Sequence, residues 1–232
     1  MTSRPIPKLF KNASFTVEND SYAVSLDDKP LIAAPNEKIA TLICAEWNAQ
    51  GESIKPETMP IYSILVTAME QATTQREGIT QGIQEYIDGD LLFYRAPEPV
   101  KLVDIQKPLW DDAMSKAEDV FKTSFDITYD LTAIRQSETY HTAINASINA
   151  LDIYKFTAFH ILVSVTGSPI LATLGIEGQL NADEIINIIR CEDHFYAALY
   201  KMDDDERPKD QKQKDKSIQQ DIESCLTFTS TL

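Results

Sequence analysis

The chain has 232 residues, of which 43% are hydrophobic and 25% are charged, and its formal net charge is −15. This composition is ordinary for a globular protein, and the length suits one large domain or two small ones. The negative charge argues against binding to nucleic acid or to an anionic membrane surface, because both attract clustered lysine and arginine. It favours a protein partner with a basic or polar surface.

No stretch of the sequence is long and apolar enough to predict a membrane span. The most apolar stretch covers only residues 156–165, whereas a spanning helix needs about 20 apolar residues. The start of the chain lacks the features of a signal peptide or a transit peptide. Cys44, Cys191 and Cys225 are odd in number and widely spaced, which is typical of reduced thiols. We therefore expect a cytoplasmic bacterial protein, or a mitochondrial matrix protein if the source is a eukaryote.

The first part of the chain predicts β-structure. Residues 13–18 and residues 22–26 alternate between apolar and polar side chains, and the turn pair at 19–20 joins them. This arrangement predicts a hairpin. A second turn signal at 27–29 precedes residues 30–33, which predict a short third strand at best.

The period of the apolar residues then changes to that of helices. A first helix is predicted between a cap at Asn36 and Gly51, and further helical faces follow at residues 64–72 and 79–87. Pro108 suits the first turn of a helix that continues to residue 121.

Residues 140–165 predict one long helix or two consecutive helices, and a short helix follows over 169–175. The last clear helix begins at Asn181, where Glu184 three residues later predicts a capping box. Residues 203–216 are almost entirely polar, which indicates a tail that is flexible or weakly helical. We therefore expect an α+β fold, with a β-rich domain over 1–55, an α-helical domain over 56–202 and a tail over 203–232.

The sequence contains no strong signature of an enzyme, a metal site or a cofactor site. His141, His160 and His194 are far apart, and Gly78 and Gly82 lack the context of a phosphate-binding loop. We expect no metal, no cofactor and no catalytic residues. A small hydrolase that uses Cys191 and His194, three residues apart on one helix, is a less favoured alternative.

Two short segments carry unusual charges. Glu192 and Asp193 interrupt the apolar helix after Asn181, which fits either a partner-recognition site or an exposed helix edge. In residues 90–96, Asp90 and Arg95 flank large side chains, and we expect Arg95 to pair with an acidic residue in a mainly structural role. By elimination, the chain is interpreted as a protein that acts by binding another protein.

Several strings, in this order, resemble the chaperones of mitochondria and alphaproteobacteria that assemble the catalytic head of ATP synthase. They are residues 7–10 (PKLF), 22–31 (YAVSLDDKPL), 45–51 (AEWNAQG), 56–60 (PETMP), 86–96 (YIDGDLLFYRA), 106–111 (QKPLWD), 167–168 (GS), 177–180 (EGQL) and 192–193 (ED). The resemblance covers about residues 7–200. The chain is a divergent member, because Tyr196, Tyr200 and Lys201 replace a Gln and a Trp-Gly pair of the family's final helix, and Phe93 replaces a Cys.

The resemblance implies a β-rich domain followed by a helical domain, and a function without catalysis. The chaperone would bind the alpha subunit of the head and cover its subunit interface until the beta subunit replaces it. It implies partner-binding roles for Glu192, Asp193 and Phe195, and Trp47, Asp90 and Arg95 are expected to be structural or interface residues. A general adaptor or holdase with no link to ATP synthase is the alternative from the class of binding proteins.

Overall fold

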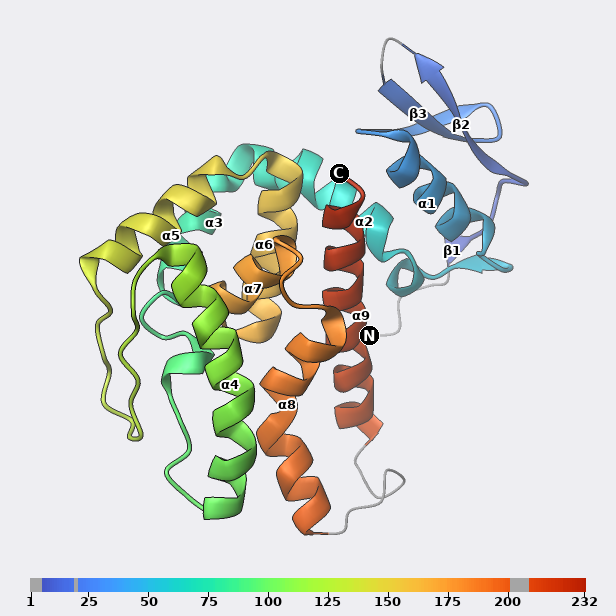
Figure 1. Ribbon diagram of the computed structural model, residues 1–232. Coiled ribbons are helices and arrows are strands. Elements are labelled where there is room, and N and C mark those ends of the chain that lie inside the picture. The colour runs from blue at the N-terminus through green and yellow to red at the C-terminus, as the bar shows by residue number, and fades with distance from the viewer. Residues whose placement is uncertain (1–5, 19–20, 201–208) are drawn as a thin grey trace.

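A computed structural model describes residues 6–18, 21–200 and 209–232. A small β-rich part at the N-terminus is followed by a larger helical part (Figure 1). The α+β fold expected from the sequence is confirmed, with the β-strands preceding most of the helices. The boundaries of the two expected domains, 1–55 and 56–202, stay predictions.

The β-rich part contains an antiparallel sheet in the order β2-β3-β4, and helix α1 packs on it. Residues Val24 and Ala34 are buried between sheet and helix. A separate antiparallel pair joins β1 to β5. The elements are β1 (Ile6–Pro7), β2 (Ala13–Glu18), β3 (Ser21–Leu26), β4 (Lys29–Ala34), α1 (Glu37–Asn48) and β5 (Ser53–Ile54).

The ends of α1 hold the β-rich part together. The side chain of Asn36 accepts the N–H of Ile39 at 3.0 Å, as expected of a cap. At the other end the Asn48 side chain accepts the N–H of Ala13 at 2.7 Å and donates to its carbonyl at 2.9 Å. β2 is an edge strand, so the backbone N–H and carbonyl groups on its outer side have no neighbouring strand to bond to. Asn48 supplies hydrogen bonds to these groups at the start of β2.

The first helices after the β-rich part follow one another with little interruption. The turn η1 (Pro56–Thr58) leads into α2 (Pro60–Thr67), and a π-helical turn η2 (Ala68–Ala72) joins it to α3 (Thr73–Gln84). The carboxylate of Glu46 accepts the N–H groups of Ile61 and Tyr62 at 2.8 and 2.9 Å. These bonds satisfy donors in the first turn of α2 and tie it to α1.

Helix α4 (Val100–Phe121) follows the short turn η3 (Leu91–Phe93) and corrects the expectation for Pro108. Pro108 lies inside α4, and the helix begins after Pro99, more than two turns earlier. Proline lacks the N–H that would bond to the carbonyl of Asp104, but Asp104 is exposed, so that water can satisfy this carbonyl. The eight residues of α4 before Pro108 therefore remain helical.

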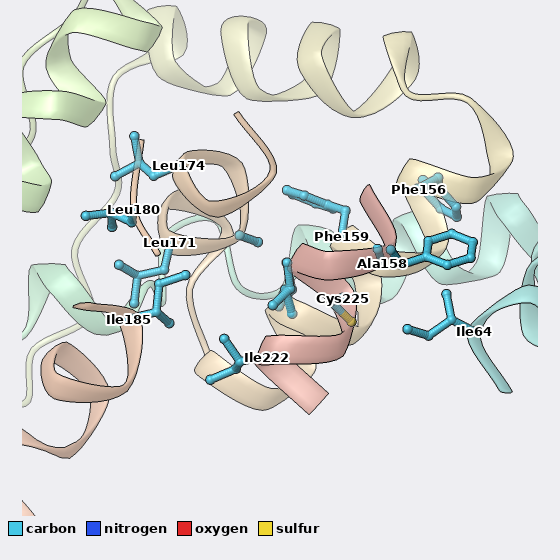
Figure 2. Packing of buried hydrophobic residues seen from close by; sticks show 14 of the residues in the cluster. Ile64, Phe156, Ala158, Phe159, Leu171, Leu174, Leu180, Ile185, Ile222 and Cys225 are labelled. Atoms are coloured by element: carbon cyan, nitrogen blue, oxygen red, sulfur yellow. The ribbon is translucent and has the colours of Figure 1, made fainter. Parts of the chain in front are cut away.

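The core of the helical part surrounds α6. The segment predicted as one or two helices forms two, α5 (Glu138–Ala150) and α6 (Ile153–Thr166), and α7 (Pro169–Ile176) follows. Asp152 separates them, because its carboxylate accepts two N–H groups at the start of α6. Residues of α6 and α7 such as Phe156, Phe159 and Leu171 are fully enclosed (Figure 2).

The last two helices are α8 (Ala182–Leu199) and α9 (Lys209–Ser230). Residues 209–230 of the expected flexible or weakly helical tail form helix α9, while residues 203–208 lie outside the described residues. Helix α9 packs on α2, α6 and α8 and passes between the rest of the helical part and the β-rich part (Figure 1). Ile222 and Cys225 of α9 belong to the same core as Ile64 and Phe159 (Figure 2), and Phe228 is fully buried. Although α9 is mostly polar, the narrow apolar stripe along one side of it is enough to pack this helix against the core.

Within the described residues, no helix has both the length and the apolar character that crossing a bilayer requires. All three cysteines are buried free thiols, as their apolar sequence surroundings predict for Cys44 and Cys191.

Candidate functional site

Helix α8 carries the three residues predicted to bind a partner, and a capping box sets its start. The Asn181 side chain accepts the N–H of Glu184 at 3.0 Å, and the Glu184 carboxylate accepts the N–H of Asn181 at 2.7 Å. The capping box expected from the sequence is confirmed. The first half of α8 packs on α4 and α7 through Ile185, Ile188 and Cys191.

The second half of α8 is less covered by the neighbouring helices. Apolar side chains are exposed there, on the first turns of the neighbouring helix α4, and on the loop between α4 and α5. In Figure 1 the start of α4 and the end of α8 lie together at the bottom of the helical part. We call this region the α8 end surface, and it comprises Ile105, Tyr129, Leu131, Tyr196, Leu199 and Tyr200. Such a grouping of exposed apolar side chains is typical of a surface that binds another protein.

Two shallow hollows lie on either side of α8 within this surface. The first, of about 380 Å³, lies between α8, the residues 94–98 and the residues 129–131, and Glu192 and Tyr196 line it. The second, of about 460 Å³, lies between α4 and α8, and Phe195 lines it. The Phe195 ring is half-buried and contacts Tyr196 edge-on, with 5.2 Å between ring centroids. Glu192 and Phe195 therefore border different hollows.

Glu192 is held in place although its side chain is exposed. Its Oε1 atom accepts from the Nε2 of Gln106 on α4 at 2.9 Å. Gln106 is itself buried, and its Oε1 accepts the N–H of Ala96 at 3.0 Å. An amide supplies a hydrogen bond but no positive charge, so within the described part of the chain Glu192 presents a fixed carboxylate without an ion-pair partner at the edge of the first hollow.

Asp193 has a different environment from its neighbour. Its Oδ2 atom accepts from Nη1 of Arg190 at 2.6 Å, and Arg190 also pairs with Asp215 of α9. Asp193 therefore lies on the side of α8 that faces α9, where its charge is already paired. The two acidic residues expected to act together lie on different sides of the helix.

Arg95 and Asp90 are held by many contacts, as their predicted structural role requires. Arg95 pairs with Asp111 at 2.9 Å, which confirms the expected acidic partner, and its guanidinium lies 5.3 Å from the ring of Trp110. Asp90 is completely buried, and its carboxylate accepts hydrogen bonds from Leu92, Ser168 and Ile170. Asp90 fixes the turn η3 to the start of α7, and Arg95 also lines the first hollow.

Trp47 lies in the β-rich part, apart from the α8 end surface. It is buried between the rings of Phe10 and Tyr62, with edge-on contacts at 5.5 and 5.1 Å between centroids. These contacts account for Trp47 as a packing residue between α1 and α2.

The environment of Cys191 speaks against the hydrolase alternative. Burial raises the pKa of the Cys191 thiol to about 11, and the nearby Glu192 carboxylate adds to the rise. A nucleophilic cysteine needs the opposite shift, because the thiolate is the reactive form. Cys191 packs against α4 and is 4% exposed, whereas His194 is exposed.

The three histidines have separate surroundings. His141 is bonded to Asp88 at 2.8 Å, burial lowers the pKa of His160, and His194 borders α9. Across residues 6–18, 21–200 and 209–232, no group of three or more His, Cys, Asp or Glu residues could hold a metal ion.

Sequence reasoning missed Gln106, Tyr129 and Leu131. Gln106 lies in the string at 106–111, but no pattern indicated that its amide would position Glu192. Leu131 is 99% exposed in a loop that also exposes Ile127 and Tyr129, and apolar residues repeated in a loop are a signal that could have indicated a binding surface. Lys201, one of the divergent positions of the final helix, lies outside the described residues.

The chain was compared with known families and structures. The sequence model of the family described as "ATP12 chaperone protein" matches residues 7–118. The crystal structure of Atp12 from Paracoccus denitrificans has a TM-score of 0.86 and 26% identity, over 97% of each chain. A point mutant of the same Atp12p has a TM-score of 0.85, also with 26% identity over 97% of each chain.

A third structure, a candidate chaperone from Agrobacterium tumefaciens, has a TM-score of 0.85 and 24% identity over 95% of this chain and 85% of that one, and supports the fold. The match over 7–118 and the likeness to Atp12 along nearly the whole chain agree with the order of the strings found in the sequence. The chain thus matches the ATP12 chaperone family over residues 7–118, and along nearly its whole length it resembles Atp12.

Proposed function

We propose that this protein binds the alpha subunit of the F-type ATP synthase catalytic head and covers its subunit interface until the beta subunit replaces it. The match to the ATP12 chaperone family and the likeness to Atp12 support a role in ATP synthase assembly. The proposed site of action is the bacterial cytoplasm, or the mitochondrial matrix in a eukaryote. The choice of the alpha subunit follows from the family resemblance.

One observation supports the α8 end surface as the binding face. Exposed apolar side chains from α4, α8 and the loop between α4 and α5 surround Glu192, whose carboxylate is fixed by Gln106. Apolar contacts supply most of the affinity of a protein interface, whereas a fixed charge sets its register. A subunit interface waiting for its partner exposes an apolar surface that is prone to aggregation, and this surface could cover it.

Release requires no chemistry by the chaperone. If beta binds the same face of alpha more tightly, mass action displaces the chaperone without nucleotide hydrolysis. The exchange therefore depends on relative affinity, and purified beta subunit should compete with the chaperone for alpha.

A charge-reversed variant tests the binding face. Glu192→Lys combined with Asp193→Lys is expected to weaken binding to the purified alpha subunit at least about 100-fold, because it replaces the fixed carboxylate within the apolar surface by a cation and also reverses the charge of the neighbouring Asp193. Isothermal titration or a pull-down with purified alpha subunit measures the loss.

The matched control is Glu77→Lys with Glu85→Lys on and beside α3, two exposed acids at the other end of the helical part (Figure 1). It changes the net charge equally and should bind alpha like the wild type. Wild-type affinity in the Glu192/Asp193 variant would refute the α8 end surface as the binding face. Protection of unrelated proteins from aggregation, with no competition by beta, would favour a general holdase instead.

A further inference from the structure

The hollow beside Glu192 is lined by both acidic and aromatic side chains. It has a volume of about 380 Å³ and is formed by residues 94–98, the side of α8 and the tip of the loop at 129–131. This volume falls within the range of pockets that bind small ligands or single anchoring side chains. The α8 end surface is thus hollowed at the position of its fixed carboxylate.

The charges that line the hollow are predominantly negative. Glu98, Asp130 and Glu192 contribute carboxylates, and Arg95 is the only cation among the lining residues. Arg95 pairs through its Nη1 atom with Asp111 at 2.9 Å, a carboxylate that Lys107 shares, so the three lining carboxylates outnumber the one lining cation. A cationic group that enters the hollow therefore meets an uncompensated negative potential.

Glu192 is preorganised to accept a hydrogen bond from such a group. Gln106 holds one carboxylate oxygen at 2.9 Å and is itself only 2% exposed. A carboxylate held by a buried amide loses little freedom when it binds, which favours affinity.

The walls of the hollow suit a flat cation better than a compact one. Tyr94, Tyr129 and Tyr196 supply aromatic rings, and Leu131 adds an exposed apolar side chain. A guanidinium group stacks on aromatic rings, is weakly hydrated and bonds to carboxylates through a planar fork, whereas an ammonium group is a strongly hydrated point charge.

A second feature of the wall is a buried donor without an acceptor. The Arg95 side chain is 4% exposed, and its Nε and Nη1 atoms donate to Leu92 and Asp111. Its Nη2 atom has no hydrogen-bond partner among the described residues. A buried donor of this kind is costly to leave unpaired.

We infer that the hollow receives an arginine side chain from an extended segment of the bound subunit. The guanidinium stacks on the tyrosine rings and bonds to Glu192. This inference rests on the proposed function, and it names the side chain that the α8 end surface recognises.

Short peptides test the hollow without the alpha subunit. The ¹⁵N-labelled full-length protein is titrated with acetyl-Ala-Arg-Ala-amide and, separately, with the same peptide carrying citrulline, which has nearly the shape of arginine but no charge. Saturable shifts are expected at the amides of Ala96, Asp130 and Glu192. The arginine peptide should bind about tenfold more tightly than the citrulline peptide, because a charged hydrogen bond is replaced by a neutral one.

Two variants assign this preference. Glu192→Gln keeps the shape of the side chain and should reduce the tenfold preference to about threefold or less, because only Glu98 and Asp130 then remain to attract the cation, whereas Glu77→Gln on α3 should keep the tenfold difference. Equal binding of the two peptides to the wild type, or an undiminished preference in Glu192→Gln, would overturn the inference.

Purified alpha subunit, added to the same samples, separates this inference from the proposed function. Binding of alpha without any arginine preference overturns the inference alone. An arginine preference without binding of alpha supports the chemistry of the hollow and overturns the proposed function.

Discussion

Replacing Asp90 with alanine is expected to lower the free energy of unfolding by about 4 kcal/mol. The Asp90 carboxylate is completely buried and accepts from the Oγ of Ser168 at 2.8 Å and from the N–H groups of Ile170 and Leu92, each at 3.0 Å. Alanine would leave these donors buried without an acceptor, at a cost of roughly 1–2 kcal/mol each. Chemical denaturation of both proteins measures the difference.

The control for this experiment is Asp112→Ala on α4. Asp112 forms an exposed pair with Lys116 at 2.7 Å, and exposed pairs contribute about 0.5 kcal/mol or less. A loss for Asp90→Ala no larger than that for Asp112→Ala would show that the buried bonds of Asp90 add nothing to stability.

The effect of Asp90→Ala is expected to depend on pH. Burial raises the pKa of Asp90 from 3.8 to about 6, while its three hydrogen bonds limit the rise. Between these two values the folded protein binds a proton that the unfolded chain does not bind, so acidification stabilises the wild type through this group. The alanine variant lacks this gain, and its loss of stability should be about 1 kcal/mol larger at pH 5 than at pH 7. The same loss at both pH values would contradict the raised pKa.

Replacing Phe228 with alanine is expected to cost about 3–5 kcal/mol, comparable with the loss of a large side chain from the centre of a core. Phe228 lies on α9, has no exposed surface, and its ring centroid is 6.5 Å from that of Tyr154. Removing the ring leaves a cavity that the neighbouring helices fill only in part. Thermal and chemical denaturation measure the loss.

Thr227→Ala, at an exposed position of the same helix, is the matched control and should change stability by less than about 0.5 kcal/mol. A chain ending at residue 208 loses Ile222, Cys225 and Phe228 together and should fail to fold cooperatively. If that shortened chain unfolds like the full chain, then α9 contributes nothing to the core.

Much of the fold could be predicted because the relevant signals are local. The alternation at 13–18 and 22–26 gave the hairpin, and the structure pairs Phe15 with Val24 in that hairpin. Asn36 and Asn181 both cap helices as their side chains predicted. Each of these features depends on residues within a few positions of one another, so the sequence displays it directly.

Features of the fold that depend on contacts between residues far apart in the sequence were not predicted correctly or were missed. Pro108 was expected to start a helix, but packing of Leu102, Gln106 and Trp110 on both sides of it keeps α4 continuous. In the candidate site, the sequence indicated that Glu192 and Asp193 bind a partner together. Their different environments, one beside α4 and the other facing α9, depend on how the helices pack and could not be predicted. Their roles in binding stay predictions that the variants above test.

The sequence by itself determined the α+β order of elements, the caps of α1 and α8 and the acidic residues of α8. Only the tertiary structure decided that α9 completes the core, that Gln106 directs Glu192 into a hollow, and that Arg190 turns Asp193 toward α9. The physical reason is the range of the interactions. Caps and apolar periods act between neighbours in the chain, whereas burial and pairing depend on which distant surfaces meet.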